Sequence, residues 1–291
     1  MLVEAIEKIS GFTRPIHSVV RAYDNQVTAS ASTLFFVNDH GVAITCKHVA
    51  DLLVSGDPIW ANFEQFKAAK RQIPEGKGYR AALQSLEAKF SYKKNTTVQL
   101  INSLANCGGF SGITCRSHPD LDLAIVTLEG FHNKQYTSHA TFVKDTGKVK
   151  QGKYLCRYGF PFAEFNNFRL NPDTDNIEWT REGQVNSPAF PIDGIITRFT
   201  GSEARIIGIE MSTPGLRGQS GGPLFDQDGL VYGMQYATNH LHLGFDLKDF
   251  EIVNNGKKER VSDSAFLHVG LSVHVDRIKE FLSDNNIEFF E

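Results

Sequence analysis

The chain has 291 residues, of which 41% are hydrophobic, so it is long enough to bury the core of one domain or of two domains that share an interface. A formal net charge of −3 gives no overall reason to expect binding to nucleic acid or to an anionic membrane. No stretch is long and apolar enough to span a bilayer, so a membrane-spanning protein is not expected.

The first ten residues place apolar side chains at helical spacing, interrupted by charges. They lack the basic start, the uninterrupted apolar segment and the small-residue cleavage site of a signal peptide. The chain also has four cysteines without the Cys-x-x-Cys spacing of a zinc or redox site, and we expect four reduced thiols. These features predict a cytoplasmic protein of bacterial or phage type, with no metal and no cofactor.

Short apolar strands separated by polar turns fill the first part of the chain. We predict strands at residues 16–23 and 32–37, and a third that ends at His48. A further apolar strand follows Asp122, in the run Leu-Ala-Ile-Val-Thr-Leu. This pattern predicts an N-terminal β-barrel over residues 12–140.

The segment between His48 and Asp122 is longer than a compact barrel needs, and residues 58–92 lose the β pattern. Asp57 can cap a helix with Pro58 at its first position, and apolar residues recur at helical spacing on both sides of a breaker at 74–78. We therefore expect an inserted helical hairpin over about 58–92, acting as a lid or as the docking site of a regulatory protein. The eight basic and three acidic residues between positions 61 and 94 fit a solvated face better than a nucleic-acid interface.

The second half of the chain repeats the pattern of short strands. These strands are expected at residues 153–160, 195–199, 204–210, 230–236 and 269–275. A glycine-rich hairpin precedes the fourth strand, and an amphipathic helix at 276–282 follows the last one. We expect a C-terminal β-barrel with a terminal helix over residues 150–291, joined to the first barrel between 130 and 152.

Three motifs carry reactive side chains in the order His, Asp, Ser. Thr-Cys-Lys-His ends at His48, Asp-Leu-Ala-Ile begins at Asp122, and Gly-Gln-Ser-Gly-Gly-Pro contains Ser220. A serine nucleophile needs a base, and the base needs a carboxylate to orient it. The turn around Ser220 also allows the amides of Gly218 and Ser220 to form an oxyanion hole.

This order and these flanks resemble the chymotrypsin-like serine peptidases, closest in style to the catalytic part of bacterial high-temperature-requirement peptidases without a PDZ domain. The resemblance implies an all-β-dominated fold of two six-stranded antiparallel β-barrels. It implies a serine endopeptidase that cleaves a protein or peptide substrate through an acyl-enzyme. In that reaction Ser220 is the nucleophile, His48 is the base, and Asp122 rather than Asp120 orients the base.

The same resemblance places the substrate pocket, with Pro214 at its floor and Tyr236, Ala237 and Thr238 along its walls. No carboxylate stands at these positions, so we expect no preference for lysine or arginine and favour small or medium apolar side chains. Gln219 also replaces the aspartate that pairs with a new N-terminus in digestive relatives. Without that ion pair, we expect control through a flexible loop at residues 212–217.

Two alternatives to an active peptidase stay open. The first is a binding module on a peptidase fold, with the three residues present in sequence but misaligned in space. The second is an esterase, because the serine motif also satisfies the Gly-x-Ser-x-Gly pattern of α/β-hydrolases. That pattern requires a helix after the serine and the order Ser, Asp, His, whereas residues 221–229 predict a β-hairpin, so the esterase has less support.

Overall fold

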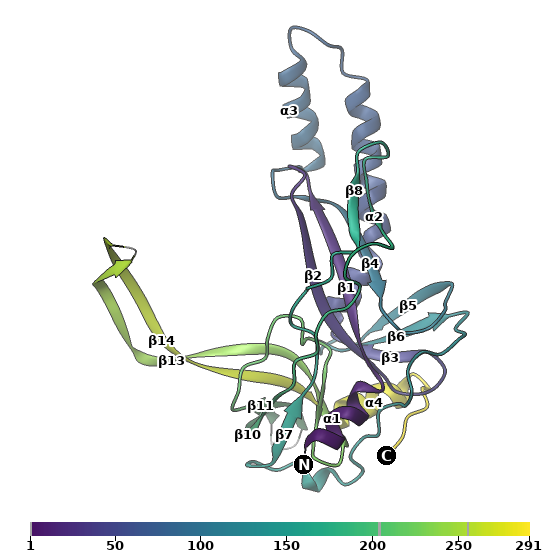
Figure 1. Cartoon of the computed structure of the whole chain (residues 1–291), viewed down its shortest axis with the longest axis vertical. Coiled ribbons are helices and arrows are strands. Elements are labelled where there is room, and N and C mark those ends of the chain that lie inside the picture. Colours follow the sequence, from purple (N-terminus) through teal and green to yellow (C-terminus); the bar gives the residue numbers. More distant parts are fainter. Residues whose placement is uncertain (1, 203–204, 255) are drawn as a thin grey trace.

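A computed structural model describes residues 2–202, 205–254 and 256–291 (Figure 1). Two six-stranded antiparallel sheets form the body of the molecule, with a helical hairpin inserted in the first half and a helix after the last strand. The expected chymotrypsin-like architecture is therefore confirmed. Among the residues described, no helix has the length and apolar character needed to cross a membrane.

The first sheet is open and curled, with the strand order β4-β1-β2-β3-β6-β5. Its strands are β1 (Thr13–Ala22), β2 (Val27–Phe36), β3 (Val42–Thr45), β4 (Thr97–Leu104), β5 (Gly112–Ser117) and β6 (Ala124–Glu129). A short helix, α1 (Leu2–Ser10), precedes them. In this order β3 lies between β2 and β6, with Thr45 opposite Ala124. That pairing brings together the two chain segments that follow β3 and precede β6.

The second sheet closes into a barrel with the order β10-β11-β14-β13-β12-β7. Its strands are β7 (Tyr154–Arg157), β10 (Ile192–Ser202), β11 (Arg205–Met211), β12 (Pro223–Phe225), β13 (Val231–Asn254) and β14 (Lys257–His274). A separate two-stranded sheet is formed by β8 (Phe168–Asn171) and β9 (Asn176–Trp179), and a 3₁₀ turn, η1 (Thr146–Lys148), lies before β7. The last helix is α4 (Val275–Asp284), whose N-terminus is capped by the His274 side chain.

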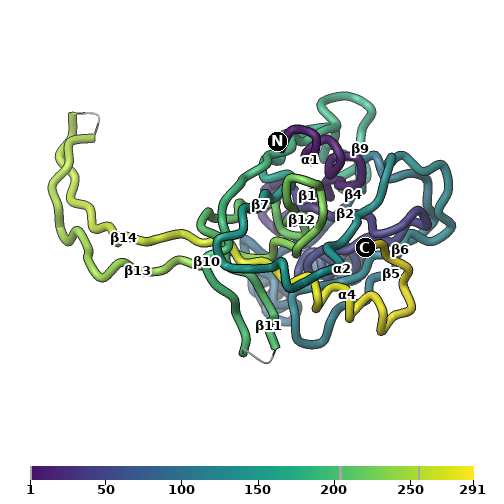
Figure 2. The backbone as a smooth tube through the Cα atoms, turned by 90° about the horizontal axis from the view of Figure 1, so that it is seen from below, coloured from purple at the N-terminus to yellow at the C-terminus, as the bar shows by residue number. Residues whose placement is uncertain are grey.

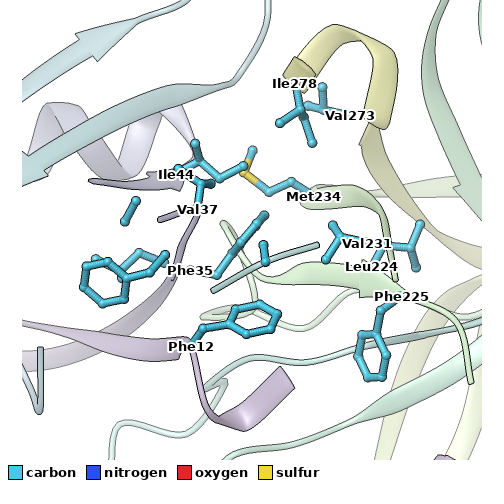
Figure 3. Close-up of a cluster of buried hydrophobic side chains, with 14 of the residues drawn as sticks. Phe12, Phe35, Val37, Ile44, Leu224, Phe225, Val231, Met234, Val273 and Ile278 are labelled. Atoms are coloured by element: carbon cyan, nitrogen blue, oxygen red, sulfur yellow. The ribbon is translucent and has the colours of Figure 1, made fainter. Parts of the chain in front are cut away.

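One hydrophobic core spans both sheets (Figure 3). Phe35 of β2 and Ile44 of β3 belong to the same buried cluster as Leu224 of β12, Met234 of β13 and Ile278 of α4. Burial of each such side chain contributes roughly 1.5–3 kcal/mol to folding. The two sheets are therefore one packed body rather than two separable units.

The helical hairpin consists of α2 (Lys47–Arg71) and α3 (Tyr79–Phe90). The expected start at Asp57 and Pro58 is wrong, because α2 begins at Lys47 and continues through Pro58. Proline has no N–H to donate inside a helix, which costs one backbone bond. The segment stays helical because α2 packs on β4, and at Gly56 a Cβ would lie 2.7 Å from the Leu100 carbonyl oxygen. Gly56 therefore marks a close approach of helix and strand rather than a turn.

The hairpin has a small core of its own, which is largely aromatic. Phe63 and Phe66 of α2 are buried together with Tyr92 and Val98, which follow α3. The partly buried side chains around them are Trp60, Leu83, Leu86, Phe90 and Tyr23. The helical periodicity in the sequence therefore identified the packed face of both helices.

The strands β13 and β14 extend far beyond the predicted ranges 230–236 and 269–275. They continue as a two-stranded ribbon that stands away from the body of the molecule (Figures 1 and 2). We call residues 239–254 and 256–268 the β-arm. Its large exposed apolar side chains are Leu243, Phe245, Leu247, Phe250, Val253, Phe266 and Leu267. No strand is predicted for these residues from the sequence, and the ribbon carries their apolar side chains into solvent.

Candidate active site

His48 and Asp122 form a two-point contact at the start of α2. The His48 Nδ1 atom lies 2.7 Å from Asp122 Oδ2, and the His48 amide donates to Asp122 Oδ1 at 3.0 Å. His48 lies in the first turn of α2 because β3 already ends at Thr45. The Cys46 side chain makes no cap bond, so Asp122 satisfies a free amide of the helix while it orients the imidazole. This geometry leaves His48 Nε2 available to a reacting group.

The environment of Asp122 keeps its carboxylate charged. Burial acts to raise the pKa of Asp122, but hydrogen bonds from the His48 side chain and backbone outweigh this effect, so the pKa lies below its ordinary value. Asp122 can therefore stabilise a protonated His48. Asp120 is exposed, and in the described chain its carboxylate makes no bond to His48.

The turn that carries Ser220 is fixed from both sheets. Thr33 of β2 donates through its amide to the Ser220 carbonyl at 3.0 Å and through its hydroxyl to the Gly218 carbonyl at 2.7 Å. Gly221 has a φ of +88°, and a Cβ on it would lie 2.0 Å from the Thr33 carbonyl oxygen, so only glycine fits there. Sequence reasoning missed Thr33, because a threonine inside a strand carries no signal of this contact.

Gln219 holds the loop before the serine without an ion pair. Its side chain is fully buried, donates to the Phe190 carbonyl at 2.7 Å and accepts from the Leu216 amide at 3.0 Å. Thr238 also donates to the Gly215 carbonyl at 2.6 Å. The loop expected to be flexible at residues 212–217 is thus tied to the barrel by neutral hydrogen bonds.

The amides proposed for an oxyanion hole are unoccupied donors. In the described part of the chain, neither the Gly218 nor the Ser220 N–H donates to a protein acceptor, whereas Gln219, Gly221 and Gly222 all do. Free amides on a turn fixed by Thr33 are the preorganised donors that stabilise a developing negative charge.

Ser220 itself is not bonded to His48. Its hydroxyl donates to the Tyr236 carbonyl at 3.5 Å, which is at the outer limit for a hydrogen bond. Among the described residues no hydrogen bond joins Ser220 to His48. The segment that carries His48 nevertheless contacts the second barrel, because the Cys46 thiol donates to the Gln235 carbonyl of β13 at 3.3 Å. The Asp–His pair is formed and the Ser–His contact is not.

A pocket of about 470 Å³ opens beside Ser220. Pro214, Ala237 and Thr238 line it, whereas Tyr236 is placed differently, with its carbonyl at the serine and its ring half-buried beside the core. Basic residues that the sequence did not assign to the pocket, or assigned only weakly, also line it: Arg217, His240 and His268. The two histidines stand opposite each other on the first residue pairs of the β-arm.

Cys46, His48 and Asp122 place their ligand atoms within 4.8 Å of one another. Burial raises the pKa of the Cys46 thiol well above its ordinary value, so the sulfur keeps its proton and donates to Gln235. A zinc-type site needs a thiolate. The Asp–His pair beside a protonated thiol explains this cluster, and we assign no metal to it. All four cysteines of the chain are free.

The fold is that of a serine peptidase of the two-barrel class. A family model of the trypsin-like peptidase domain matches residues 32–234, and the chain belongs to this family.

Among solved structures, the HtrA-type protease AlgW with a tripeptide, and a variant of it with a tripeptide, each align with a TM-score of 0.50 and 13% identity. Each alignment covers 97% of this chain and 62% of the other, so this chain spans less than two thirds of those proteins. At this identity the likeness concerns the fold. No curated protein matches the sequence.

Proposed function

We propose that this chain is a serine endopeptidase that hydrolyses peptide bonds of a protein or peptide through an acyl-enzyme. His48 Nε2 takes the proton of Ser220 as the serine oxygen attacks the carbonyl carbon, and later gives it to the leaving amine. The amides of Gly218 and Ser220 stabilise the oxyanion. A water molecule activated by His48 then releases the acyl group. The observation that carries the proposal is the two-point contact of Asp122 with His48.

The proposal requires Ser220 to turn from Tyr236 toward His48 when substrate binds. The bond it leaves is 3.5 Å long and therefore weak. Hydrogen bonds of catalytic groups are commonly long in free enzymes and tighten in the substrate complex.

A serine-directed fluorophosphonate probe tests this function. Wild-type protein should react at Ser220, as identified by peptide mapping, and Ser220→Ala should lose peptide hydrolysis by roughly 10⁴-fold or more. Ser55→Ala is the matched control, because Ser55 is exposed on α2 and bonds only to the Leu52 carbonyl. Wild-type-like turnover by Ser220→Ala would contradict the assignment.

One observation favours a second candidate, a binding module whose triad never closes. This observation is the missing hydrogen bond between Ser220 and His48 in the described chain. Such a module would bind peptides but leave the probe unreacted at every peptide concentration. Labelling of Ser220, with or without added peptide, rules it out.

The helical hairpin is part of the proposal as the docking site of a regulatory protein. A single helix, α2, carries His48 in its first turn and ends at Arg71, where the loop at the hairpin tip begins. A partner at the tip therefore acts on the helix that holds the base. Arg71→Glu combined with Lys77→Glu should change the processing of protein substrates or the activation by protein partners and leave hydrolysis of a small ester unchanged.

We also propose that the protein is located in the cytoplasm.

A further inference from the structure

The pocket beside Ser220 presents basic and hydrogen-bond-donating groups. Arg217, His240 and His268 line it. Among the residues that the structure describes, its lining contains no aspartate or glutamate. A substrate side chain that enters the pocket therefore meets potential donors and positive charge without a compensating anion.

A buried arginine lies directly behind the pocket wall. Arg157 is fully buried and donates to Gln235 Oε1 at 3.0 Å and to the Thr213 carbonyl at 2.9 Å, and Gln235 is part of the pocket lining. Burial lowers the pKa of Arg157 to about 10, which leaves it a cation at neutral pH.

In the described chain no carboxylate bonds to Arg157, and its Nε has no partner at all. The Asp193 carboxylate acts on it only through space and accepts a bond from Tyr154. A buried charge without an ion-pair partner is costly, so an anion placed near it is stabilised.

The two histidines are held in position by each other. They are paired in register across β13 and β14, their rings are 4.6 Å apart, and their Nδ1 atoms share a hydrogen bond. The imidazole that accepts this bond has no proton on Nδ1, so it carries one on Nε2. At least one Nε2–H donor is therefore available beside the pocket, whatever the charge of the pair.

From these groups we infer that the pocket binds an acidic side chain, so that the peptidase cleaves after glutamate or aspartate. The inference rests on the proposed function. It replaces the expectation of a small apolar side chain. That expectation rested on Pro214 and residues 236–238, and not on His240 and His268, which line the pocket from the first part of the β-arm. Arg157 supplies a fixed positive field, while Arg217 and the histidine pair supply direct contacts.

A library of peptides that vary only in the residue before the cleaved bond tests the inference. Wild-type protein should cleave after glutamate with a kcat/KM at least about tenfold higher than after glutamine, which has the same shape without the charge. Arg217→Gln and His268→Gln should each reduce this ratio, because each removes a group that the charged glutamate side chain uses. Arg80→Gln, on the exposed face of α3, is the matched control and should leave the ratio intact.

The outcomes separate this inference from the proposed function. Equal cleavage after glutamate and glutamine, or a preference for basic or apolar residues, overturns the inference while the peptidase function stands. Labelling of Ser220 by the fluorophosphonate probe without cleavage of any acidic peptide also overturns it. Absence of both labelling and hydrolysis overturns the inference and the proposed function together. The Arg217 and His268 variants change exposed side chains and leave the buried Arg157 in place. The test therefore does not depend on an Arg157 variant that folds.

Discussion

Two hairpins leave the body of the molecule at the active site, and they are stabilised in different ways (Figure 1). The helical hairpin starts beside His48 and buries Phe63 and Phe66 in a core of its own. The β-arm starts beside His240 and His268, yet Phe245 is 63% exposed.

The comparison shows that length and apolar content do not decide whether a projection is rigid. A two-stranded ribbon is marginally stable in water unless something covers one of its faces. Such a ribbon also has two edges whose backbone groups are unpaired. The helical hairpin is supported in addition by β4, which packs against α2, and by Asp175, which bonds to Lys67 of α2 and to Arg21 of β1. It can transmit a displacement to His48, whereas the described part of the outer β-arm is held by its ladder and by exposed ion pairs such as Arg260 with Asp249.

Asp122→Ala should have the largest effect, because Asp122 bonds to the backbone and the side chain of His48, the proposed base, at the start of the helical hairpin. Peptide hydrolysis should fall by roughly 10⁴-fold, since His48 loses its orienting partner. The free energy of unfolding should also fall by about 1 kcal/mol, because an amide of α2 loses its cap. Kinetics and urea unfolding measure the two effects. Asp120→Ala should change neither, and a similar loss in both variants would contradict the assignment.

A pair of phenylalanine substitutions compares the two projections directly. Phe66→Ala should lower the free energy of unfolding by about 3–5 kcal/mol, because it empties a buried site in the helical hairpin. Phe250→Ala in the β-arm should change it by less than about 0.5 kcal/mol, because that side chain is 57% exposed. Chemical denaturation of both variants checks the difference. Equal losses would show that the arm is packed in solution.

Acid should weaken the body of the molecule through one buried histidine. His17 of β1 is buried, bonds to Ser187 at 3.0 Å and stacks on Phe165, and burial lowers its pKa to about 4. Between the ordinary value of about 6.5 and 4, the unfolded chain binds a proton that the folded protein does not. Stability should therefore fall as the pH falls, by about 2 kcal/mol from pH 7 to pH 5.

His17→Gln, which cannot titrate, should remove most of this slope in denaturation experiments. Replacement of exposed His242 in the β-arm is the control and should retain it. A full slope in His17→Gln would assign the acid response to other groups.

Shortening the β-arm should also have a small effect. Joining residues 242 and 266 through a two-residue turn removes exposed apolar side chains, ladder bonds and the exposed ion pairs of Arg260 with Asp249 and of Lys258 with Glu251. Thermal stability should change by less than about 1 kcal/mol, and amides of the outer arm should exchange with solvent far faster than those of α2 in the intact protein. Slow exchange throughout the arm would mean that the ribbon is covered in solution.

The sequence predicted those features that depend on neighbouring residues. Strand periodicity and the breaker at 74–78 gave the two sheets and the break between α2 and α3, and the motifs at His48, Asp122 and Ser220 gave the catalytic assignment, which stays a prediction. The start of α2 was missed because its cap, Asp122, lies far away in the chain.

Other features depend on what covers a residue, and that information is not local. The alternating pattern at residues 239–254 shows which side chains share a face, but not that no core covers them. The burial of Arg157 was missed for the same reason. An arginine at the end of a strand normally indicates a solvated surface. Gln219 predicted the missing ion pair but not the neutral bonds that replace it.

The order of strands in the closed barrel has a consequence for biosynthesis. Strand β14 (Lys257–His274) lies between β11 and β13, so the barrel cannot close until residues 257–274 have been made. His48 and Asp122 leave the ribosome first, Ser220 follows, and the pocket wall that contains His268 comes last. Under the proposed mechanism, a growing chain cannot cut itself or its neighbours, because hydrolysis becomes possible only after translation has passed β14.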